Sequence, residues 1–510
     1  MIAELYEKLR QGINVRQNLI KAKELLRGKD RARERDELLS HCGGDFSVLL
    51  SCLSSEDAKA RKNAALVIGE LSVPKLLTPL WEAYEAEQTR FVRSAHLTAL
   101  KSYDYAELLP RLKDALKRVG AEEVCEENRK HLQEERMLLR GLISAKEDVK
   151  PHCYTGDGLV CGLVLTTNRN HKHVLLSGLG ACRKKELAAG VMVQTKEASS
   201  LYGLRTFEEM FFVLPGCKTV PADPGEAAKA LVQAGLASYL KERHKENGAP
   251  FRFRIELRST MTLEKRSAFV RRMAAVLEEQ GRGELVNVTD GYEVELRLIE
   301  TKEKSFHVLL KLFTLRDYRF AYRRKTIAAG MRPFLAAFCM ALAGDETDGG
   351  GHSFFRENAQ VLDPFCGAGT MLIERAKYAP VKQMFGLDIL EEAVLAAREN
   401  TRLADERANY VHRDFFTFQR EEAFDEIVTD MPFTVSENEE RKQEIAELYR
   451  RFFLRAPEFL KEDGVLLLLT HDRGLVKKYG QVPFVCLKEF ELSMKEGSYL
   501  FLMRKCCQQT

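Results

Sequence analysis

The spacing of apolar positions changes twice along the 510-residue chain. From residue 1 to about 146, apolar side chains recur at helical intervals, which predicts helix after helix with almost no strand. Residues 147–325 mix strand-like runs with helical stretches, which predicts an α+β region. Residues 326–510 alternate strands with helices, which predicts a parallel sheet covered by helices in a Rossmann-like α/β domain. Three domains are therefore expected.

The helical domain carries a weak repeat with a spacing of 32 residues, in which Arg61 recurs as Arg93. The stretch 57–71 resembles the second half of a HEAT repeat, and its small Ala64 and Ala65 permit close packing of helices. Stacked helix pairs leave one face open to a partner, so we expect a protein to bind there. A plain helical bundle is the alternative.

The middle region is predicted from short runs. Strands are expected over 158–165, 173–176 and 190–193, and a helix over 226–243. The next elements are a strand over 251–258, a helix over 262–280 and strands over 293–299 and 305–312. This β-α-β-β order, closed by a Tyr-Arg pattern over 317–325, resembles the THUMP domain, an RNA-binding module of RNA-modifying enzymes.

Positive charge gathers in the same region. Lys and Arg outnumber Asp and Glu by 20 to 13 over residues 241–325, whereas acids outnumber bases by 27 to 22 over residues 351–510. A basic exposed face would hold RNA through its phosphates, although an ordinary solvated face is the alternative. The candidate RNA contacts are Arg254, Arg271, Arg323, Arg324 and Lys325.

Composition narrows the class of protein. With 45% hydrophobic and 30% charged residues, the chain is globular. Its twelve cysteines form no C-x-x-C pair and no cluster with histidine at metal-ligand spacing, so neither disulfides nor a metal is expected. The start is not signal-like and no apolar run reaches about 18 residues, so we expect a cytoplasmic protein with no membrane contact.

Candidate chemistry begins where the first strand of the C-terminal domain ends. Val361 and Leu362 lead into an acid, a turn with two glycines, and a helix. Such a loop brings backbone N–H groups and a helix N-terminus to a ligand. Neither G-x-G-x-x-G nor G-K-[ST] is present, and the spacing suits a ligand with an amino acid end, which points to S-adenosyl-L-methionine. The candidate cofactor residues are Asp363, Pro364, Phe365, Cys366, Gly367, Gly369 and Thr370.

The next two strands also end in acids. Asp388, followed by Ile389, comes 25 residues after Asp363 and can accept the ribose hydroxyls of a nucleoside. Asp414 and Phe415 follow the third strand and suit an adenine, with a carboxylate for its amino group and an apolar side chain at the ring edge. Because ligands bind at the carboxyl ends of parallel strands, all these residues are expected in one cofactor site.

The fourth strand runs into Asp430, Met431, Pro432 and Phe433, a [N/D]-x-P-[F/Y] pattern that resembles the active site of amino-group methyltransferases. An exocyclic amine has its lone pair delocalised into the ring, so acceptors must hold its protons before it attacks a methyl group. The Asp430 side chain and the Met431 carbonyl can accept them, while Phe433 offers a face for stacking.

Together these motifs resemble the THUMP-containing class I RNA methyltransferases that form N2-methylguanosine. The resemblance covers about 328–505 most closely and implies a structured RNA substrate, tRNA rather than rRNA. One residue departs from the pattern, because Thr434 stands where the family usually has glycine. The alternatives are methylation of adenine N6 or of a protein glutamine amide, and a non-catalytic RNA-binding scaffold with a degenerate methyltransferase domain.

Overall fold

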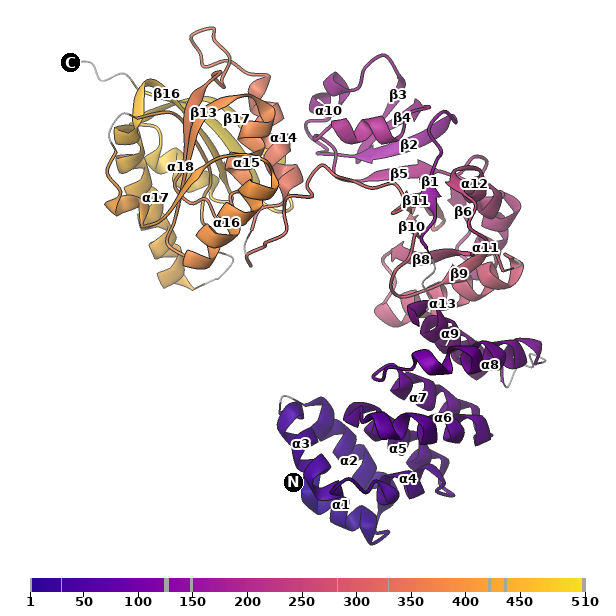
Figure 1. Cartoon of the computed structure of the whole chain (residues 1–510). Coiled ribbons are helices and arrows are strands. Elements are labelled where there is room, and N and C mark those ends of the chain that lie inside the picture. Colours follow the sequence, from indigo (N-terminus) through magenta and orange to yellow (C-terminus); the bar gives the residue numbers. More distant parts are fainter. Residues whose placement is uncertain are drawn as a thin grey trace. The chain divides into compact units, whose positions relative to one another are not determined.

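The computed structural model describes residues 2–28, 30–122, 128–146, 150–281, 283–328, 330–420, 423–434 and 438–506. They divide into two compact units, whose elements Figure 1 labels. The first comprises Met1–His152, Val220–Lys241 and Lys245–Phe306, and the second comprises Cys153–Thr219, Glu242–His244 and His307–Thr510. The region 147–325 thus contributes to both units, and the predicted division into three domains stays a prediction.

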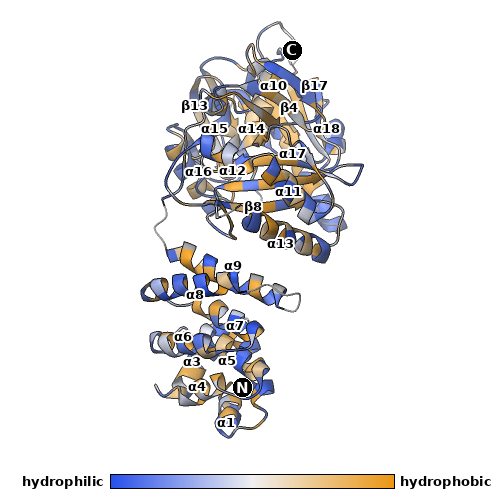
Figure 2. Ribbon diagram, turned by 90° about the vertical axis from the view of Figure 1, so that its right-hand side faces the viewer, coloured by the Kyte–Doolittle hydropathy of each residue, from blue (hydrophilic) through white to orange (hydrophobic). Residues whose placement is uncertain are grey.

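The N-terminal part of the first unit is helical, as predicted. Hydrophilic and hydrophobic residues share each helix (Figure 2), and the apolar ones form a continuous core that includes Trp81 and Tyr84. A Cβ atom on Gly69 would lie 2.8 Å from the Ala99 Cα, so two helices touch through their backbones there. The assignment of this helical region to HEAT-like repeats stays a prediction. The helices are α1 (Ile2–Arg10), α2 (Val15–Arg27), α3 (Arg31–Cys42), α4 (Ser47–Leu53), α5 (Ala58–Leu71), α6 (Leu77–Ala86), α7 (Arg90–Leu100), α8 (Leu109–Ala121) and α9 (Arg129–Lys146).

The rest of the first unit contains the predicted strand–helix–strand order. Strand β8 (Phe251–Arg258) pairs in parallel with β9 (Leu285–Asn287) and with β10 (Val294–Glu300). Helix α13 (Leu263–Gln280) begins after Thr262, whose side chain caps it. The single helix predicted over 226–243 is wrong, because Gly235, at φ 74°, separates α11 (Pro224–Gln233) from α12 (Leu236–Glu242).

The second unit begins with an antiparallel sheet of order β3-β4-β2-β5-β11. The strand predicted over 173–176 is wrong, because these residues begin a short helix, α10 (His173–Gly178), that buries Val174 and Leu175. An apolar run this short does not distinguish a strand from a helix. The strands are β2 (Cys161–Thr166), β3 (Arg183–Leu187), β4 (Gly190–Thr195), β5 (Met210–Val213) and β11 (Phe306–Leu312).

The C-terminal sheet has seven strands in the order β14-β13-β12-β15-β16-β18-β17. The first five are parallel, and β18 is antiparallel to both of its neighbours. Figure 1 shows the sheet between two helical layers, which are α14, α15 and α16 on one side and α17 and α18 on the other. Each layer has its own core, so Val361 points into one and Leu362 into the other. This is the predicted α/β fold of class I methyltransferases.

The strands and helices of this domain have the following bounds. The strands are β12 (Ala359–Asp363), β13 (Val381–Asp388), β14 (Asn409–His412), β15 (Phe424–Asp430), β16 (Leu460–Thr470), β17 (Phe484–Ser493) and β18 (Ser498–Lys505). The helices are α14 (Pro333–Gly344), α15 (Thr370–Tyr378), α16 (Glu391–Leu403), α17 (Glu439–Phe459) and α18 (Arg473–Tyr479).

A buried ion pair fastens α15 to β15. Arg375 Nε and Nη2 donate to the two carboxylate oxygens of Glu426 at 2.7 and 2.9 Å, and neither side chain is exposed. The guanidinium also donates to the carbonyl oxygens of Ala379 and Arg356, at 2.9 and 3.0 Å. The pair therefore links the helix after the glycine loop to the strand that ends at Asp430.

We predict that Glu426→Gln strongly destabilises the second unit, because it leaves the buried Arg375 guanidinium without its counter-ion. Removing one partner of a buried pair costs about 3–5 kcal/mol of unfolding free energy. Urea unfolding followed by circular dichroism checks this. Glu399→Gln, which removes the exposed partner of Arg402, is the control and should leave the transition unchanged. Equal midpoints for the two variants would contradict the prediction.

Candidate functional site

Two glycines shape the loop after the central strand β12. Gly367 and Gly369 have φ angles of 52° and 81°, in the left-handed region that glycine adopts without strain. A Cβ atom on Gly369 would lie 2.6 Å from the Tyr410 Oη, so a larger residue does not fit. Gly369 is also the residue from which α15 starts. The loop thus brings its backbone and a helix N-terminus to the carboxyl edge of the sheet.

Asp363, at the end of β12, is a buried carboxyl group with few partners. Its Oδ1 accepts hydrogen bonds from the Thr429 hydroxyl at 2.9 Å and the Phe365 N–H at 3.1 Å. Burial raises the pKa of Asp363 to about 8, and the carboxylates of Asp430 and Asp388 add to the shift. A positive charge beside it would favour the ionised form. An ammonium group, such as the one at the amino acid end of S-adenosyl-L-methionine, supplies such a charge.

Asp388, at the end of β13, links two strand ends. Its Oδ2 accepts from the Gly367 N–H at 2.9 Å, and its Oδ1 accepts from the Leu390 N–H at 2.9 Å. Each carboxylate oxygen has a second lone pair, which suits the two hydroxyls of a ribose. The neighbouring Ile389 side chain is 67% exposed, although apolar, and can cover one face of a planar ring.

The contact predicted for Phe415 is corrected by the structure. Asp414 caps the short turn that follows β14, accepting from the Phe416 N–H at 2.9 Å. The Phe415 ring is only 1% exposed and packs against Phe365, Phe452 and Phe459. It therefore belongs to the core on the α17 side of the sheet and offers no edge to an adenine.

Asp430, at the end of β15, has a buried carboxyl group that lacks a hydrogen-bond partner on one oxygen in the described part of the chain. Its Oδ1 is buried and has no hydrogen-bond partner among the described residues. Burial raises the pKa of this carboxyl to about 7. A buried acceptor without a donor costs free energy, so it marks a place for a ligand that donates hydrogen bonds.

The residues after Asp430 form one wall of the site. The Met431 N–H donates to the Leu469 carbonyl at 2.9 Å, which continues the pairing of β15 with β16. Pro432 follows, and the Phe433 ring is 41% exposed, with its centroid 4.1 Å from that of His471. An exposed ring at the edge of the sheet can stack on a planar substrate.

Sequence reasoning missed the end of β16. Thr470 lies 2.7 Å from the Tyr449 hydroxyl, and the His471 Nδ1 lies 2.9 Å from the Glu496 carbonyl oxygen. These contacts hold His471 against Phe433. The apolar run over 465–469 ends in Thr-His-Asp, so the strand-end rule used for the other four parallel strands would have identified these residues as well.

Cys366 fills space inside the glycine loop. Its side chain is buried, and burial raises the pKa of its thiol well above the ordinary value. A nucleophilic cysteine needs the opposite shift. This agrees with its interpretation as a small residue of the cofactor loop.

The basic face predicted on β8 is also corrected. Arg254 pairs with Glu256 at 3.0 Å and with Glu295 of the adjacent strand at 3.8 Å, and its guanidinium lies over the Tyr292 ring. Arg254 is therefore neutralised by neighbouring carboxylates. Arg271 of α13 remains exposed.

The other candidate RNA contacts lie on a segment that packs beside the cofactor loop. The Arg324 and Lys325 N–H groups donate to the Asn400 Oδ1 at 3.2 and 3.0 Å, and the Asn400 Nδ2 donates to the Ala368 carbonyl at 3.1 Å. The side chains of Arg324 and Lys325 are exposed, whereas burial lowers the pKa of Arg323. Two of the three cations therefore remain available to a phosphate.

Part of the second unit is similar in sequence to known methyltransferases. Residues 321–495 match the family model described as "RMKL-like, methyltransferase domain". A ribosomal protein uL3 glutamine methyltransferase of Xanthomonas campestris is 29% identical over 147 residues, which cover 25% of this chain and 48% of the relative. A U6 snRNA (guanine-N(2))-methyltransferase, THUMPD2 of Bos taurus, is 28% identical over 130 residues, or 25% of each chain. The chain thus spans about half or less of the length of these relatives.

A solved structure has the same fold. A possible methylase from Clostridium difficile 630 superposes with a TM-score of 0.50 at 18% identity, covering 69% of this chain and 99% of that one. The family match confirms a methyltransferase domain over residues 321–495, with S-adenosyl-L-methionine as its cofactor, and the solved structure shares its fold. Among the described residues, no helix has the length and apolar character needed to cross a membrane, and no group of acids, histidines and cysteines is arranged to hold a metal.

We predict that Asp363→Asn weakens cofactor binding and stabilises the protein without cofactor. Between the ordinary pKa of 3.8 and the folded value of about 8, the folded state binds more protons than the unfolded state, so wild-type stability falls as pH rises. Asparagine does not titrate. The melting temperature of the variant should therefore exceed that of wild type increasingly from pH 5 to pH 8.

Calorimetry with S-adenosyl-L-methionine at pH 8.5 should show an affinity lower by about 10- to 100-fold, the loss expected for one hydrogen bond to a charged group. Asp425→Asn, at the other end of β15, is the control and should bind normally. Unchanged affinity in Asp363→Asn would refute the assignment.

Proposed function

We propose that this chain, whose residues 321–495 form an S-adenosyl-L-methionine-dependent methyltransferase domain, methylates the exocyclic N2 of guanosine in a structured RNA, tRNA rather than rRNA. The observation that carries the proposal is the buried, unpartnered Oδ1 of Asp430 at the sheet edge where the cofactor loop lies. The THUMP-like and HEAT-like interpretations of the preceding regions, and a cytoplasmic location, belong to the same proposal.

The residues around Asp430 suit a planar amine. The bound cofactor supplies an electrophilic methyl group. The Asp430 Oδ1 and the Met431 carbonyl would accept the two amine protons, which turns the nitrogen lone pair towards that methyl. The exposed Phe433 ring, braced by His471, would stack on the base.

Asp430 can also take the proton that the methylated nitrogen releases. Burial holds the pKa of this carboxyl at about 7, close to the pH at which a general base works best. Most of the rate would come from alignment of nitrogen, methyl carbon and sulfur, for which orientation contributes about 7–11 kcal/mol.

A second candidate is methylation of a glutamine amide, since one relative carries that activity in its name. A side-chain amide is planar, has two N–H donors and fits the same acceptors. Adenine N6 meets the same description. A non-catalytic scaffold is the remaining alternative, and it is motivated by Thr434 in place of glycine. The RNA proposal is favoured because the acid-x-Pro-Phe form at residues 430–433 resembles the guanine-N2 group, and one relative carries that activity in its name. The matched domain also contains exposed cations at Arg324 and Lys325.

Mass spectrometry of nucleosides tests the substrate. In a strain lacking the gene, one N2-methylguanosine site of tRNA should lose its methyl group and regain it when the wild-type gene is returned. Unchanged N2-methylguanosine in both tRNA and rRNA would refute the proposal. Loss of a methyl group from a protein glutamine would support the second candidate.

We predict that turnover at saturating cofactor and RNA rises with pH and reaches half its maximum near pH 7. Below that pH, Asp430 is protonated and cannot act as the base that takes the proton from the nitrogen. The bound ammonium keeps Asp363 ionised, so Asp363 should not shape this profile. The rate of single-turnover methyl transfer, measured between pH 5.5 and 8.5, gives this pH profile.

The matched variant is Asp430→Asn, which keeps one acceptor oxygen but has no charge to titrate. Its turnover should fall by about 10²–10⁴-fold and become flat with pH, while cofactor affinity stays at the wild-type value. A variant that keeps the wild-type pH profile would show that another group titrates.

A further inference from the structure

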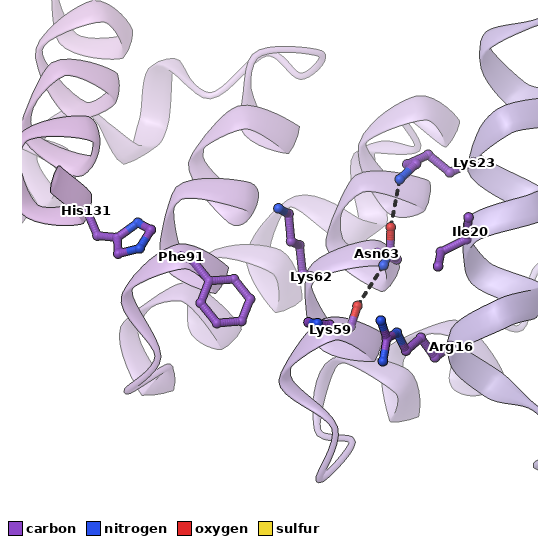
Figure 3. Close-up of a pocket in the computed structure, with 8 residues that line it drawn as sticks. All are labelled: Arg16, Ile20, Lys23, Lys59, Lys62, Asn63, Phe91 and His131. Carbon is purple, nitrogen blue, oxygen red and sulfur yellow. Dashed lines mark hydrogen bonds between the residues drawn. The ribbon is translucent and has the colours of Figure 1, made fainter. Parts of the chain in front are cut away.

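The helical part of the first unit contains a hollow of about 490 Å³. Its lining comes from α2, α5, α7 and α9, which pack against one another in that order. Figure 3 shows the side chains converging from these helices. They are Arg16, Ile20, Lys23, Lys59, Lys62, Asn63, Phe91 and His131. We name this hollow the helical groove.

The groove gathers four cations, of which none has a carboxylate partner among the described residues. The Lys23 Nζ donates to the neutral Asn63 Oδ1 at 2.8 Å, and the Lys62 Nζ lies 5.8 Å from the centroid of the Phe91 ring. Arg16 and Lys59 are exposed beside them. A cluster of like charges repels itself, and an anion placed among them would relieve that repulsion.

Three other arginines on the same helices are paired with carboxylates. Arg61 pairs with Glu87 at 2.7 Å, and Arg93 pairs with Glu135 at 2.8 Å. Arg27 pairs with Glu70 at 2.6 Å. The four cations of the groove therefore differ from these arginines in having no carboxylate partner among the described residues.

Burial lowers the pKa of Lys23, and the neighbouring charges of Arg27 and Lys62 lower it further. The side chain nevertheless points to the shared hollow, where Asn63 holds its ammonium (Figure 3). Such an arrangement is costly without an anion, which agrees with a binding role.

Flat side chains lie among these cations. The Phe91 ring is half-buried, and its centroid is 6.3 Å from that of His131. A basic groove with an aromatic surface is the combination that tracks a nucleic acid backbone and stacks an unpaired base. An acidic protein segment would pair with the cations but would have no planar base to stack on the Phe91 ring.

We propose that the helical groove binds an unpaired stretch of the RNA substrate, with Arg16, Lys59 and Lys62 on phosphates and Phe91 against a base. This inference rests on the proposed function for its choice of RNA. It moves the main RNA contact away from the face of β8, where Arg254 is neutralised, to a helical domain for which the sequence predicted a protein partner.

The test compares Arg16→Gln/Lys59→Gln/Lys62→Gln with Arg111→Gln/Lys117→Gln/Arg118→Gln, a control on α8 that removes the same charge. Fluorescein-labelled bulk tRNA is titrated by anisotropy from 50 to 300 mM KCl. Each lost phosphate contact lowers the salt slope by about 0.7, so the groove variant should lose about 2 in slope and at least tenfold in affinity at low salt. Both variants should bind S-adenosyl-L-methionine normally.

Equal tRNA affinity of the two variants would overturn the proposal. So would displacement of tRNA by poly-L-glutamate at equal charge concentration, which would assign the groove to an acidic protein. Photocrosslinking of 4-thiouridine-containing RNA to the wild-type chain gives an independent check and should label peptides containing Lys62 or Phe91.

Methyl transfer into the same tRNA separates this proposal from the proposed function. If wild type methylates tRNA and the groove variant binds it normally, only the groove assignment fails. If wild type methylates no RNA but loses tRNA binding on substitution of the groove, only the proposed function fails.

Discussion

The site depends on one constraint, which is that Asp363 and Asp430 are carboxyl groups held out of water with too few partners. Burial raises the pKa of both well above the ordinary range. The strand that carries Asp430 is joined to α15 through the fully buried Arg375–Glu426 pair, which helps the fold to tolerate this cost. The unfavourable burial prepares the sheet edge for a cation near one acid and for an amine near the other. Ligand binding then recovers what folding loses.

Many residues of this sheet edge could be predicted from sequence, because each strand end is marked by nearby residues and the same pattern recurs at successive strands. A parallel sheet places every strand end on one side, and acids and glycines at such ends are visible as residues. The packing of two side chains was not visible. The alternation of apolar positions shows that Phe415 is apolar but not that its ring joins the core of Phe452 and Phe459. The strand-end rule can identify His471, but not the packing of its ring against Phe433.

The charged surfaces show the same limit more clearly. A count of Lys and Arg cannot separate paired from unpaired cations, because the partners come from strands or helices far away in sequence. Arg254 pairs with Glu295 of the adjacent strand, so one cation of a segment that is basic in sequence is neutralised in the fold. The N-terminal helices look balanced in sequence, yet they gather unpaired cations around Phe91. On the proposal above, RNA recognition and chemistry lie in different parts of the chain.

The most direct test of the account follows the methyl group itself. The purified full-length chain is incubated with S-adenosyl-L-methionine labelled in its methyl group and with bulk RNA, and the RNA is then digested to nucleosides. The account predicts label in N2-methylguanosine, and none when Asp430→Ala replaces wild type at equal cofactor occupancy. Label in protein or in N6-methyladenosine, or undiminished transfer by Asp430→Ala, would contradict it.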